Sequence, residues 1–409
     1  MNAEDRLTET VRVEGRRLLA TLVRTLGSLQ LAEDAVQDAV LAALASWPRT
    51  GVPDDPRAWL TVTARRKAYD VLRREAVRPA KEGAASRELV AEEVVPMEPE
   101  SAVRDDLLRL VFTCCHPALA REAQVALALR TLAGLDVAAI ARAFLVPEAT
   151  MAKRLVRARQ KIATAHIPYR LPSDAELPER LPSVLAVVHL IATEGYAPSS
   201  GDGVVRVDLE VEAIRLARLV AELMPGEPEV LALLALLLLS AGRRPARVDA
   251  AGDPVLLAEQ DRSRWDAAAI REGAGLLAEA VRRSGGVAGP YQLQAHLAAC
   301  HSTAPSWADT DWYRIVDLYD LVLTLGPNPA VALNRAVAVG HRDGPAAELD
   351  ALAAIGRPAR GHLWHAARAD ALTRLGRSAD ARAELESAVT LAPTAPDRRL
   401  LTRRLAALD

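Results

Sequence analysis

The chain has 409 residues, of which 50% are hydrophobic and only 3% aromatic. A chain of this length is expected to form roughly two to four domains, and its many Leu, Ala, Arg and Glu residues favour helix over strand, so we expect an all-α protein. The net charge of −2 sums 51 basic and 53 acidic residues. It does not indicate a nucleic-acid binder, and local charge has to be examined instead.

Three features argue against a secreted or membrane protein. Cys114, Cys115 and Cys300 are too few for a disulfide framework and fit a reducing cytoplasm. Residues 1–17 are charged throughout and lack the apolar core of a secretory signal. The most apolar run, 230–241, is well short of the roughly 20 residues that span a bilayer. We therefore expect a cytoplasmic protein and a buried helix at 230–241.

Residues 5–47 predict two or three amphipathic helices. Within 31–47 an apolar face is formed at helical spacing by Ala32, Ala35, Val36, Ala39, Val40, Ala43 and Leu44. The other side collects Glu33, Asp34, Gln37 and Asp38 near the N-terminal end. Acids there can simply complement the helix dipole. They can equally form a docking face for a partner, and the segment alone leaves both interpretations open.

A turn-rich loop is predicted at 48–56, where Asp55 and Pro56 suit the cap and first turn of another helix. That helix is basic, because 57–81 holds eight Arg or Lys against two acids. Trp59, Thr63 and Tyr69 interleave with the cations, a pattern that suits single-stranded nucleic acid. The alternative is that Trp59 and Tyr69 belong to the core and the cations form a solvated rim.

Residues 83–104 hold five Glu and two Pro without sustained periodicity, which predicts an acidic linker. Two more helices are expected at 105–133. Residues 136–162 then predict two short helices around a tight connection. In the second helix an apolar stripe is formed by Met151, Leu155, Ala158 and Ile162. A second face of this helix carries, at the same spacing, Thr150, Arg154, Arg157 and Lys161.

This pattern suits a recognition helix in a major groove, with 137–144 as its supporting helix. Between 149 and 171 there is no acid to compensate the basic side chains. The alternative is an ordinary basic, solvated helix. After it, residues 167–182 hold four prolines, which predict a hinge.

A helical block is expected at 181–290, followed at 291–409 by a weak helical repeat. Its last copy has tetratricopeptide-like spacing at Ala369, Ala381, Leu385 and Ala388. Stacked helix pairs of this kind build a surface for peptides or for another domain of the same chain.

No metal site, cofactor or catalytic motif is predicted. Adjacent Cys114 and Cys115 cannot readily present both thiolates to one tetrahedral zinc, even with His116 beside them. No phosphate-binding loop, dinucleotide fingerprint or nucleophile elbow occurs. We therefore expect a protein that is not an enzyme.

Some polar residues of the second half have both a plain and a functional interpretation. The pairs His296 with His301 and His362 with His365 are interpreted as surface or core histidines. Around the Gly/Ser loop, a ligand pocket could be lined by Glu194, Tyr196 and Asp202, although a plain turn between helices is the favoured interpretation.

Two basic helical modules joined by an acidic linker are a more specific sequence signature of a protein family than either module is alone. Over about residues 5–165 the chain resembles the extracytoplasmic-function, or group IV, sigma factors of bacterial RNA polymerase. Residues 31–47 resemble their polymerase-clamp-binding helix, 55–75 their minus-ten helix and 146–162 their recognition helix. Later phrases such as CCHPAL, EGYAPSSGD and GPYQLQA resemble the subfamily with a long C-terminal extension that ends in tetratricopeptide-like repeats.

The resemblance implies a sigma factor that binds core RNA polymerase, recognises minus-thirty-five and minus-ten promoter DNA and melts the duplex. It divides the chain into region 2 (1–82), the linker (83–104), region 4 (105–166), the hinge (167–180) and the two helical parts of the extension (181–290 and 291–409). The extension is expected to regulate the sigma part. A small YCII-like (DGPF) protein is a further partner class implied by the subfamily.

The resemblance also implies contact residues. The residues expected to meet the polymerase clamp are Asp34, Gln37 and Asp38. The loop 48–55 is expected to hold a flipped base, and the minus-ten contacts are expected from Asp54, Asp55, Trp59, Thr63, Arg66, Lys67 and Arg73. At the minus-thirty-five element the base-edge contacts are expected from Glu148, Thr150, Lys153 and Arg154, and the phosphate contacts from Arg157 and Arg159.

Two residues depart from the usual recognition helix. Ala149 stands where glycine is common and Met151 where valine is common, which leaves the approach of the backbone to DNA open. The alternative function is a one-component helix-turn-helix regulator with a helical ligand- or protein-sensing domain. Such a regulator needs neither a second basic-aromatic helix nor a clamp-binding helix, so the first module argues against it.

Overall fold

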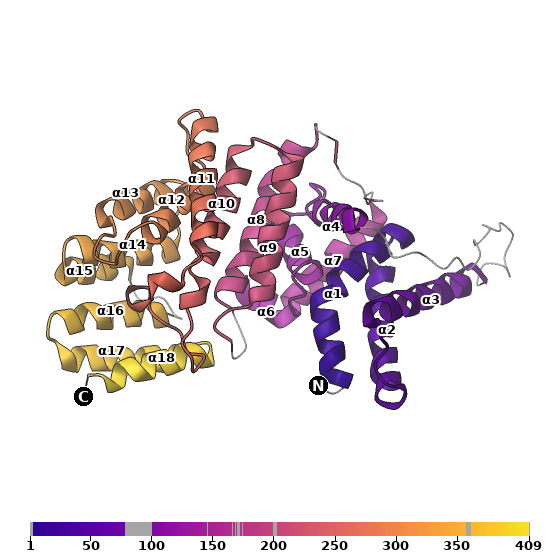
Figure 1. The fold of residues 1–409 in the computed structure, drawn as a ribbon, viewed down its shortest axis with the longest axis horizontal. Helices are drawn as coiled ribbons and strands as arrows, with labels where there is room; N and C mark the ends of the chain where they lie inside the picture. The colour runs from indigo at the N-terminus through magenta and orange to yellow at the C-terminus, as the bar shows by residue number, and fades with distance from the viewer. Residues whose placement is uncertain are drawn as a thin grey trace. The chain divides into compact units, whose positions relative to one another are not determined.

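The computed structural model describes residues 3–77, 100–144, 146–165, 167, 169, 172–173, 175–198, 203–356 and 361–408 (Figure 1). These residues form α-helices, short 3-10 helices and one isolated β-bridge between Val248 and Pro254, and none of them forms a strand. The all-α expectation is confirmed. The chain divides into two compact units, Met1–Val187 and Val188–Asp409. Among the described helices, none has both the length and the apolar character that a membrane crossing needs.

The first unit contains seven helices and the beginning of an eighth in its described part. They are α1 (Ala3–Leu26), α2 (Leu29–Thr50), α3 (Pro56–Val77), α4 (Glu100–Cys114), α5 (Arg121–Thr131), α6 (Val137–Ala143), α7 (Glu148–Thr164) and the start of α8 (Leu177–Tyr196). Helices α1, α2 and α3 pack against one another, α4 packs against α1, and α7 rests on α5 and α6. Residues 83–99, most of the expected linker, lie outside the described residues, and 100–104 already belong to α4.

Local chemistry explains where α2 and α3 begin. The Ser28 side chain accepts a hydrogen bond from the Leu31 amide at 3.3 Å, and the Asp55 carboxylate accepts one from the Ala58 amide at 2.9 Å. Both are N-terminal caps of the ordinary kind. Pro56 opens α3, where its missing N–H costs nothing. The expected cap and first-turn pair at Asp55 and Pro56 is therefore confirmed.

The end of α2 and its apolar face differ from expectation. The helix continues through Pro48 to Thr50 and stops at Gly51, whose φ of +83° favours glycine, so the connecting loop is 51–55 rather than 48–56. A proline in the last turn forfeits one hydrogen bond without ending the helix, because the Gly51 amide still reaches the Trp47 carbonyl at 3.0 Å. Leu44, expected in the core, is 43% exposed. The buried stripe is Ala32, Ala35, Ala39, Ala43 and Trp47.

The segment after α7 is anchored to the first unit. The Tyr169 hydroxyl lies 3.1 Å from the Ala20 carbonyl and 2.5 Å from the Asp106 carbonyl. Buried Arg180 reaches the Phe112 carbonyl at 3.4 Å. The division between the units therefore falls inside α8 and not in the expected hinge at 167–180. Proline content predicted a flexible connection there, but it carries no information about these long-range hydrogen bonds.

In the second unit, α10 is the buried centre. It packs against α9, α11 and α12, and it is apolar on nearly every side, as a helix enclosed by others must be. The helices of this part are α9 (Val207–Leu223), α10 (Pro228–Ala241), η2 (Arg244–Ala246), η3 (Leu257–Glu259), η4 (Arg262–Arg264), α11 (Ala267–Arg283) and α12 (Pro290–Ser302). The buried helix expected at 230–241 is confirmed.

The rest of the second unit is a series of helices in which each packs on the next (Figure 1). They are α13 (Trp312–Thr324), α14 (Pro329–Arg342), α15 (Pro345–Ile355), α16 (His362–Arg374), α17 (Ser378–Leu391) and α18 (Ala395–Ala406). The residues selected by their repeat spacing, Ala369, Ala381, Leu385 and Ala388, are all buried in α16 and α17. The His365 ring is held nearby by the Glu384 carboxylate at 2.6 Å, so it is a core histidine as expected.

Candidate nucleic-acid interface

Helix α7 has one buried face and one open basic face. Pro147 occupies the N-cap position, and the helix proper starts at Glu148. Met151, Leu155 and Ala158 are buried against the helices below, whereas Ile162 is half-buried. The predicted apolar stripe therefore orients the helix, and it leaves the predicted basic face open to solvent.

A groove of about 400 Å³ runs beside this basic face. From α7 it is lined by Thr150, Lys153, Arg154, Arg157, Ala158 and Lys161, and from the start of α5 and the turn before it by Ala118, Leu119, Ala120 and Ala123. None of these lining residues is acidic. The Arg154 guanidinium lies 5.7 Å from the centroid of the Phe144 ring, a cation–π contact that orients it. Four cations thus border one groove whose floor is made of small and apolar side chains.

Arg159 does not line this groove. Its Nε lies 2.7 Å from a carboxylate oxygen of Glu33 in α2, and its NH2 group donates to the other oxygen at 3.2 Å. Burial raises the pKa of Glu33, and the charge of Arg159 opposes that shift. Arg159 was expected at a phosphate and Glu33 on an open acidic face. In the structure the two side chains are paired with each other, so a phosphate contact by Arg159 requires this pair to open.

Helix α3 separates core and open faces in the same way. Leu60, Ala64 and Ala68 are buried, while Arg66, Lys67 and Arg73 are exposed on the other side with half-buried Thr63 between them. Asp54 is exposed in the loop before α3. Asp55, expected to contact DNA, also caps the helix, so its substitution is expected to affect α3 as well.

The two aromatic residues of α3 have different environments. The Trp59 ring meets the buried Trp47 ring edge-on, with centroids 5.5 Å apart, and is half-buried. Tyr69 is 39% exposed. The core interpretation therefore applies in part to Trp59, and Tyr69 is the aromatic side chain that is open to a base.

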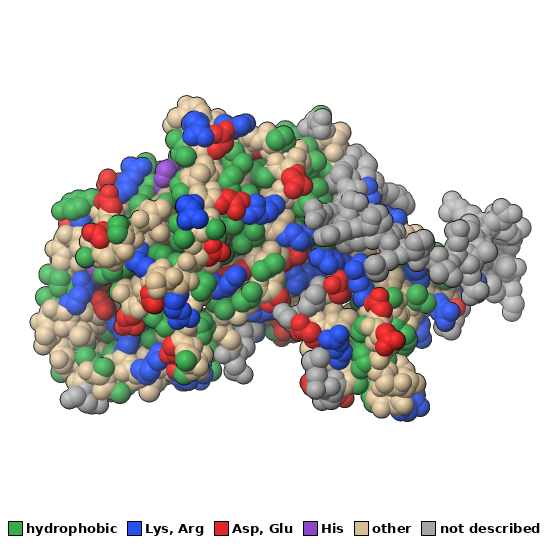
Figure 2. All heavy atoms as spheres, in the orientation of Figure 1, with side chains coloured by type: hydrophobic (Ala, Val, Ile, Leu, Met, Phe, Trp, Pro, Cys, Tyr) green, Lys and Arg blue, Asp and Glu red, His purple; other side chains and the backbone are tan. Residues whose placement is uncertain are grey.

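The face of α2 that carries Asp34, Gln37 and Asp38 is exposed, as expected for a docking surface. Two leucines of the same helix are also exposed, Leu41 at 63% and Leu44 at 43%. Acidic and hydrophobic side chains lie close together over α2 and the near end of α3 in Figure 2. Sequence reasoning missed the leucines, although the position of Leu41 outside the buried stripe was a signal.

The adjacent cysteines are structural. Cys114 and Cys115 are buried, and burial raises the pKa of the Cys115 thiol to about 12. The His116 Nδ1 accepts a hydrogen bond from the Ala118 amide at 3.1 Å and so shapes the turn that follows α4. Over the described part of the chain, no three His, Cys, Asp or Glu side chains are arranged to hold a metal ion.

Comparisons with known proteins match the same modules. Residues 10–78 match Sigma-70 region 2, 109–162 match Sigma-70, region 4, and 180–281 match a family of unknown function (DUF6596). An uncharacterized protein of Rhizobium meliloti (strain 1021) is 42% identical over 395 residues, which is 95% of this chain and 92% of that protein. The chain belongs to the sigma-70 family of sigma factors and has the extracytoplasmic-function type of architecture. No solved structure gives a significant match.

As a sigma factor, the protein is a transcription initiation factor that binds RNA polymerase and promoter DNA, and it is not an enzyme. Region 2 corresponds to α1, α2 and α3, and region 4 to the helices from α4 to α7. The match to region 2 favours the sigma factor over the one-component regulator, because such a regulator has no use for a polymerase-binding module. The DUF6596 match begins inside α8 and ends in α11, within the extension.

Proposed function

We propose that α7 reads the minus-thirty-five element and that its cations divide into two kinds. The observation that carries this proposal is the groove beside α7, which is bordered by four cations and no acid. Thr150, Lys153 and Arg154 face base edges, with Glu148 at the exposed start of the helix as a fourth contact. Arg157 meets phosphate. Base-edge contacts specify sequence, whereas phosphate contacts position the protein on the duplex.

We propose that α3 and the loop before it hold the melted minus-ten strand. Unstacking and flipping a base costs a few kcal/mol, so the protein has to provide compensating contacts on the open strand. Arg66, Lys67 and Arg73 are exposed cations of one helix, and Thr63 lies among them. Asp54 in the loop and the exposed part of Trp59 complete the proposed surface, and Tyr69 adds an aromatic plane.

We infer that core polymerase docks on α2. Asp34, Gln37 and Asp38 supply charge and hydrogen bonds, and the exposed side chains of Leu41 and Leu44 supply apolar area. Burial of leucine on docking is favourable at about 25 cal/mol per Å². An acidic face with an apolar centre suits a partner that offers a hydrophobic patch with basic residues around it.

The proposal is tested by transcription in a purified system. The full chain, core polymerase and a library of promoter fragments should yield run-off transcripts, which identify a promoter for later experiments. Permanganate should then detect unpaired thymines near minus ten, because melting exposes them. Core enzyme without this chain is the control. Absence of both transcript and open thymines across the library would contradict the proposal.

We further propose that the extension regulates the sigma part. Consecutive helices from α13 to α18 pack on one another, which supports this proposal because stacked helix pairs present surfaces to protein partners. Leu321 and Leu325 of this part are 49% and 56% exposed. A small YCII-like (DGPF) protein is the candidate partner class that the subfamily resemblance suggests.

Removal of the extension should change transcription from the selected promoter by about tenfold, if regulation has the usual coupling of 1–3 kcal/mol. The chain should end after Ala197 and not after Ala165, because Tyr169 and Arg180 stabilise the first unit. Thermal unfolding would verify that the shortened chain is folded. Equal transcription and equal polymerase affinity for the two chains would argue that the extension has no regulatory role.

A further inference from the structure

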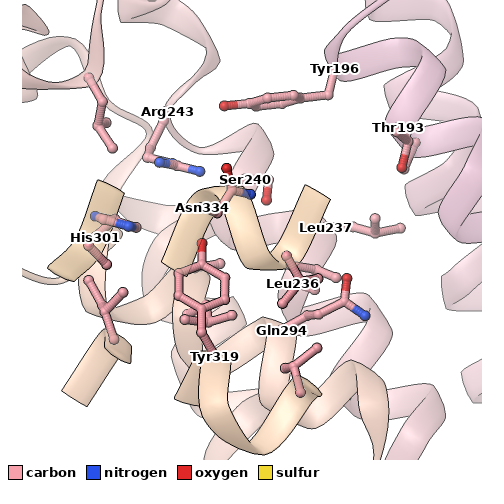
Figure 3. A pocket seen from close by; sticks show the side chains of 18 of the residues that line it. Thr193, Tyr196, Leu236, Leu237, Ser240, Arg243, Gln294, His301, Tyr319 and Asn334 are labelled. Carbon is pink, nitrogen blue, oxygen red and sulfur yellow. The ribbon is translucent and has the colours of Figure 1, made fainter. Parts of the chain in front are cut away.

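The second unit contains a cavity of about 700 Å³. Its lining residues come from α8, α9, α10, α12, α13 and α14 and from the segments that connect them, so the cavity lies entirely within that unit. Leu236, Leu237, Leu297 and Ile315 contribute apolar wall. A volume of this size falls inside the range of roughly 300–1,000 Å³ that small-molecule sites occupy. Figure 3 shows the polar side chains that project into it.

Arg243 is the charged group at the centre of this site. It follows α10, is only 8% exposed, and directs its guanidinium into the cavity, with Tyr196, Tyr319 and His301 around it (Figure 3). Its Nε is buried without an acceptor. Within the described part of the chain, its side chain has neither a carboxylate partner nor a hydrogen bond.

The nearby charges do not compensate Arg243. Glu210 is the only acid among the described residues that line the cavity, and it accepts a hydrogen bond from Arg244 at 3.0 Å. Arg247 donates to the Tyr196 carbonyl at 2.7 Å and stacks on the Tyr196 ring, so it adds a second cation behind that wall. Arg262 donates to the carbonyls of His301 and Ala304. Arg243 is therefore the one arginine among the described lining residues, and the one acid of the lining, Glu210, is already held by Arg244.

The positive charges of Arg243 and Arg262 also act on the His301 ring. Burial first, and then the charges of Arg243, Arg262 and His341, lower the pKa of His301 to about 4. The ring is neutral near pH 7, and its Nδ1 is buried without a partner. It can therefore offer a hydrogen bond without adding charge. The Ser240 side chain and the Tyr319 ring also line the cavity and are drawn near Arg243 (Figure 3).

An arginine does not lose its proton in a protein. An uncompensated buried charge is costly, and proteins normally satisfy it with a partner. Here the cavity itself has room for that partner. A carboxylate or phosphate group fits the planar guanidinium, which binds either one through two parallel hydrogen bonds.

Aromatic rings next to His301 indicate what is attached to the anion, because the Trp307 ring is stacked on His301 with centroids 6.4 Å apart and the Trp312 ring meets it edge-on at 5.6 Å. The Trp312 and His341 rings are stacked with centroids 4.2 Å apart, and the Trp307 ring meets Trp312 edge-on at 4.9 Å. All three line the cavity. Flat aromatic surfaces of this kind favour a ring or another flat apolar body. The Arg243 guanidinium and the rings beside His301 together select a molecule that carries an anionic group on a flat apolar body.

We propose that this cavity of the extension binds a small organic anion with an apolar, ring-containing body, its carboxylate or phosphate paired with Arg243 and its body against Trp307 and Trp312. The site belongs to the second unit alone, so it makes the extension a ligand-binding domain. Binding is measured without polymerase or DNA, so the outcome is independent of how the sigma part acts.

Calorimetric titration and thermal unfolding of the full chain test this with benzoate, phenyl phosphate and neutral benzyl alcohol. Both anions have few atoms, so we expect dissociation constants of about 1 mM or below. Benzyl alcohol should bind at least about tenfold more weakly, because it cannot pair with the guanidinium. A difference between benzoate and phenyl phosphate identifies the preferred anion. The melting temperature should rise with anion concentration by linkage.

The Arg243→Met variant distinguishes two roles of Arg243, as a ligand-binding residue or as a residue that stabilises the fold. Methionine removes the uncompensated charge and keeps the length of the chain, so the unliganded variant should melt at the same or a higher temperature. Its affinity for both anions should fall at least about tenfold. Arg243→Lys keeps the charge but loses the planar fork, so it should be folded and bind with intermediate affinity. Exposed Arg282→Met should behave as wild type.

Two results would overturn the assignment. One is the absence of any anion-dependent heat or melting shift in the wild-type chain at about 10 mM, well above the affinity expected for fragments of this size. The other is a lower melting temperature of Arg243→Met together with unchanged anion affinity, which would make Arg243 a structural residue.

Discussion

Leu41→Asp is expected to weaken the binding of core polymerase by about 10- to 100-fold, the equivalent of losing one buried leucine and introducing a charge at the interface. Leu41 is 63% exposed and lies one helical turn from Gln37 and Asp38. A carboxylate there has to be desolvated on docking and repels its acidic neighbours. The dissociation constant of the full chain from core polymerase, measured by biolayer interferometry, gives the effect directly.

The second unit provides a matched control. Leu363 in α16 is 60% exposed, so Leu363→Asp makes the same chemical change at almost the same exposure, far along the chain from α2. Both variants should melt within a few degrees of wild type, because surface changes usually alter stability by less than about 0.5 kcal/mol. Equal polymerase affinities of the two variants would show that α2 is not the docking helix.

Arg154→Ala and Arg157→Ala are expected to have different effects on promoter binding. Arg154 is oriented by Phe144 and borders the groove, so its loss should reduce discrimination between the cognate and a scrambled minus-thirty-five element by about 1–3 kcal/mol. Arg157, the proposed phosphate contact, should lower the affinity for both elements alike. Its loss should also reduce the slope of log affinity against log salt by about 0.9.

The measurement is holoenzyme binding to the selected promoter and to its scrambled version over a series of salt concentrations. Arg282→Ala removes an exposed arginine of α11 that has no proposed DNA role, and it serves as the control. If Arg154→Ala and Arg157→Ala changed selectivity and salt slope equally, the division into a base reader and a phosphate contact would be wrong.

Helical periodicity predicted which side of α7 is buried, but it did not predict the ion pair between Glu33 and Arg159. The spacing of Met151, Leu155 and Ala158 predicted the buried side of α7, because side chains three and four positions apart share a helix face. The same reasoning placed Arg159 on an open surface. Its actual partner is 126 positions away in the chain, and no local pattern reports a contact of that kind.

The C-terminal cavity shows the same limit. Tyr196 was named beside a ligand pocket as a possibility, and it does line the cavity, whereas Glu194 does not and Asp202 lies outside the described residues. Arg243 had no distinguishing feature in the sequence. Its importance comes from the absence of a partner, which becomes apparent only when all its neighbours are in place.

The sequence by itself determined the all-helical class, the order of the two sigma modules and the buried side of α7, because helix formation and amphipathic burial depend on residues a few positions apart. Only the tertiary structure decided which charges are paired and which are open. It tied Arg159 to Glu33, exposed Leu41 and left Arg243 buried without a counter-charge, because burial and electrostatic pairing depend on residues that are distant in the chain.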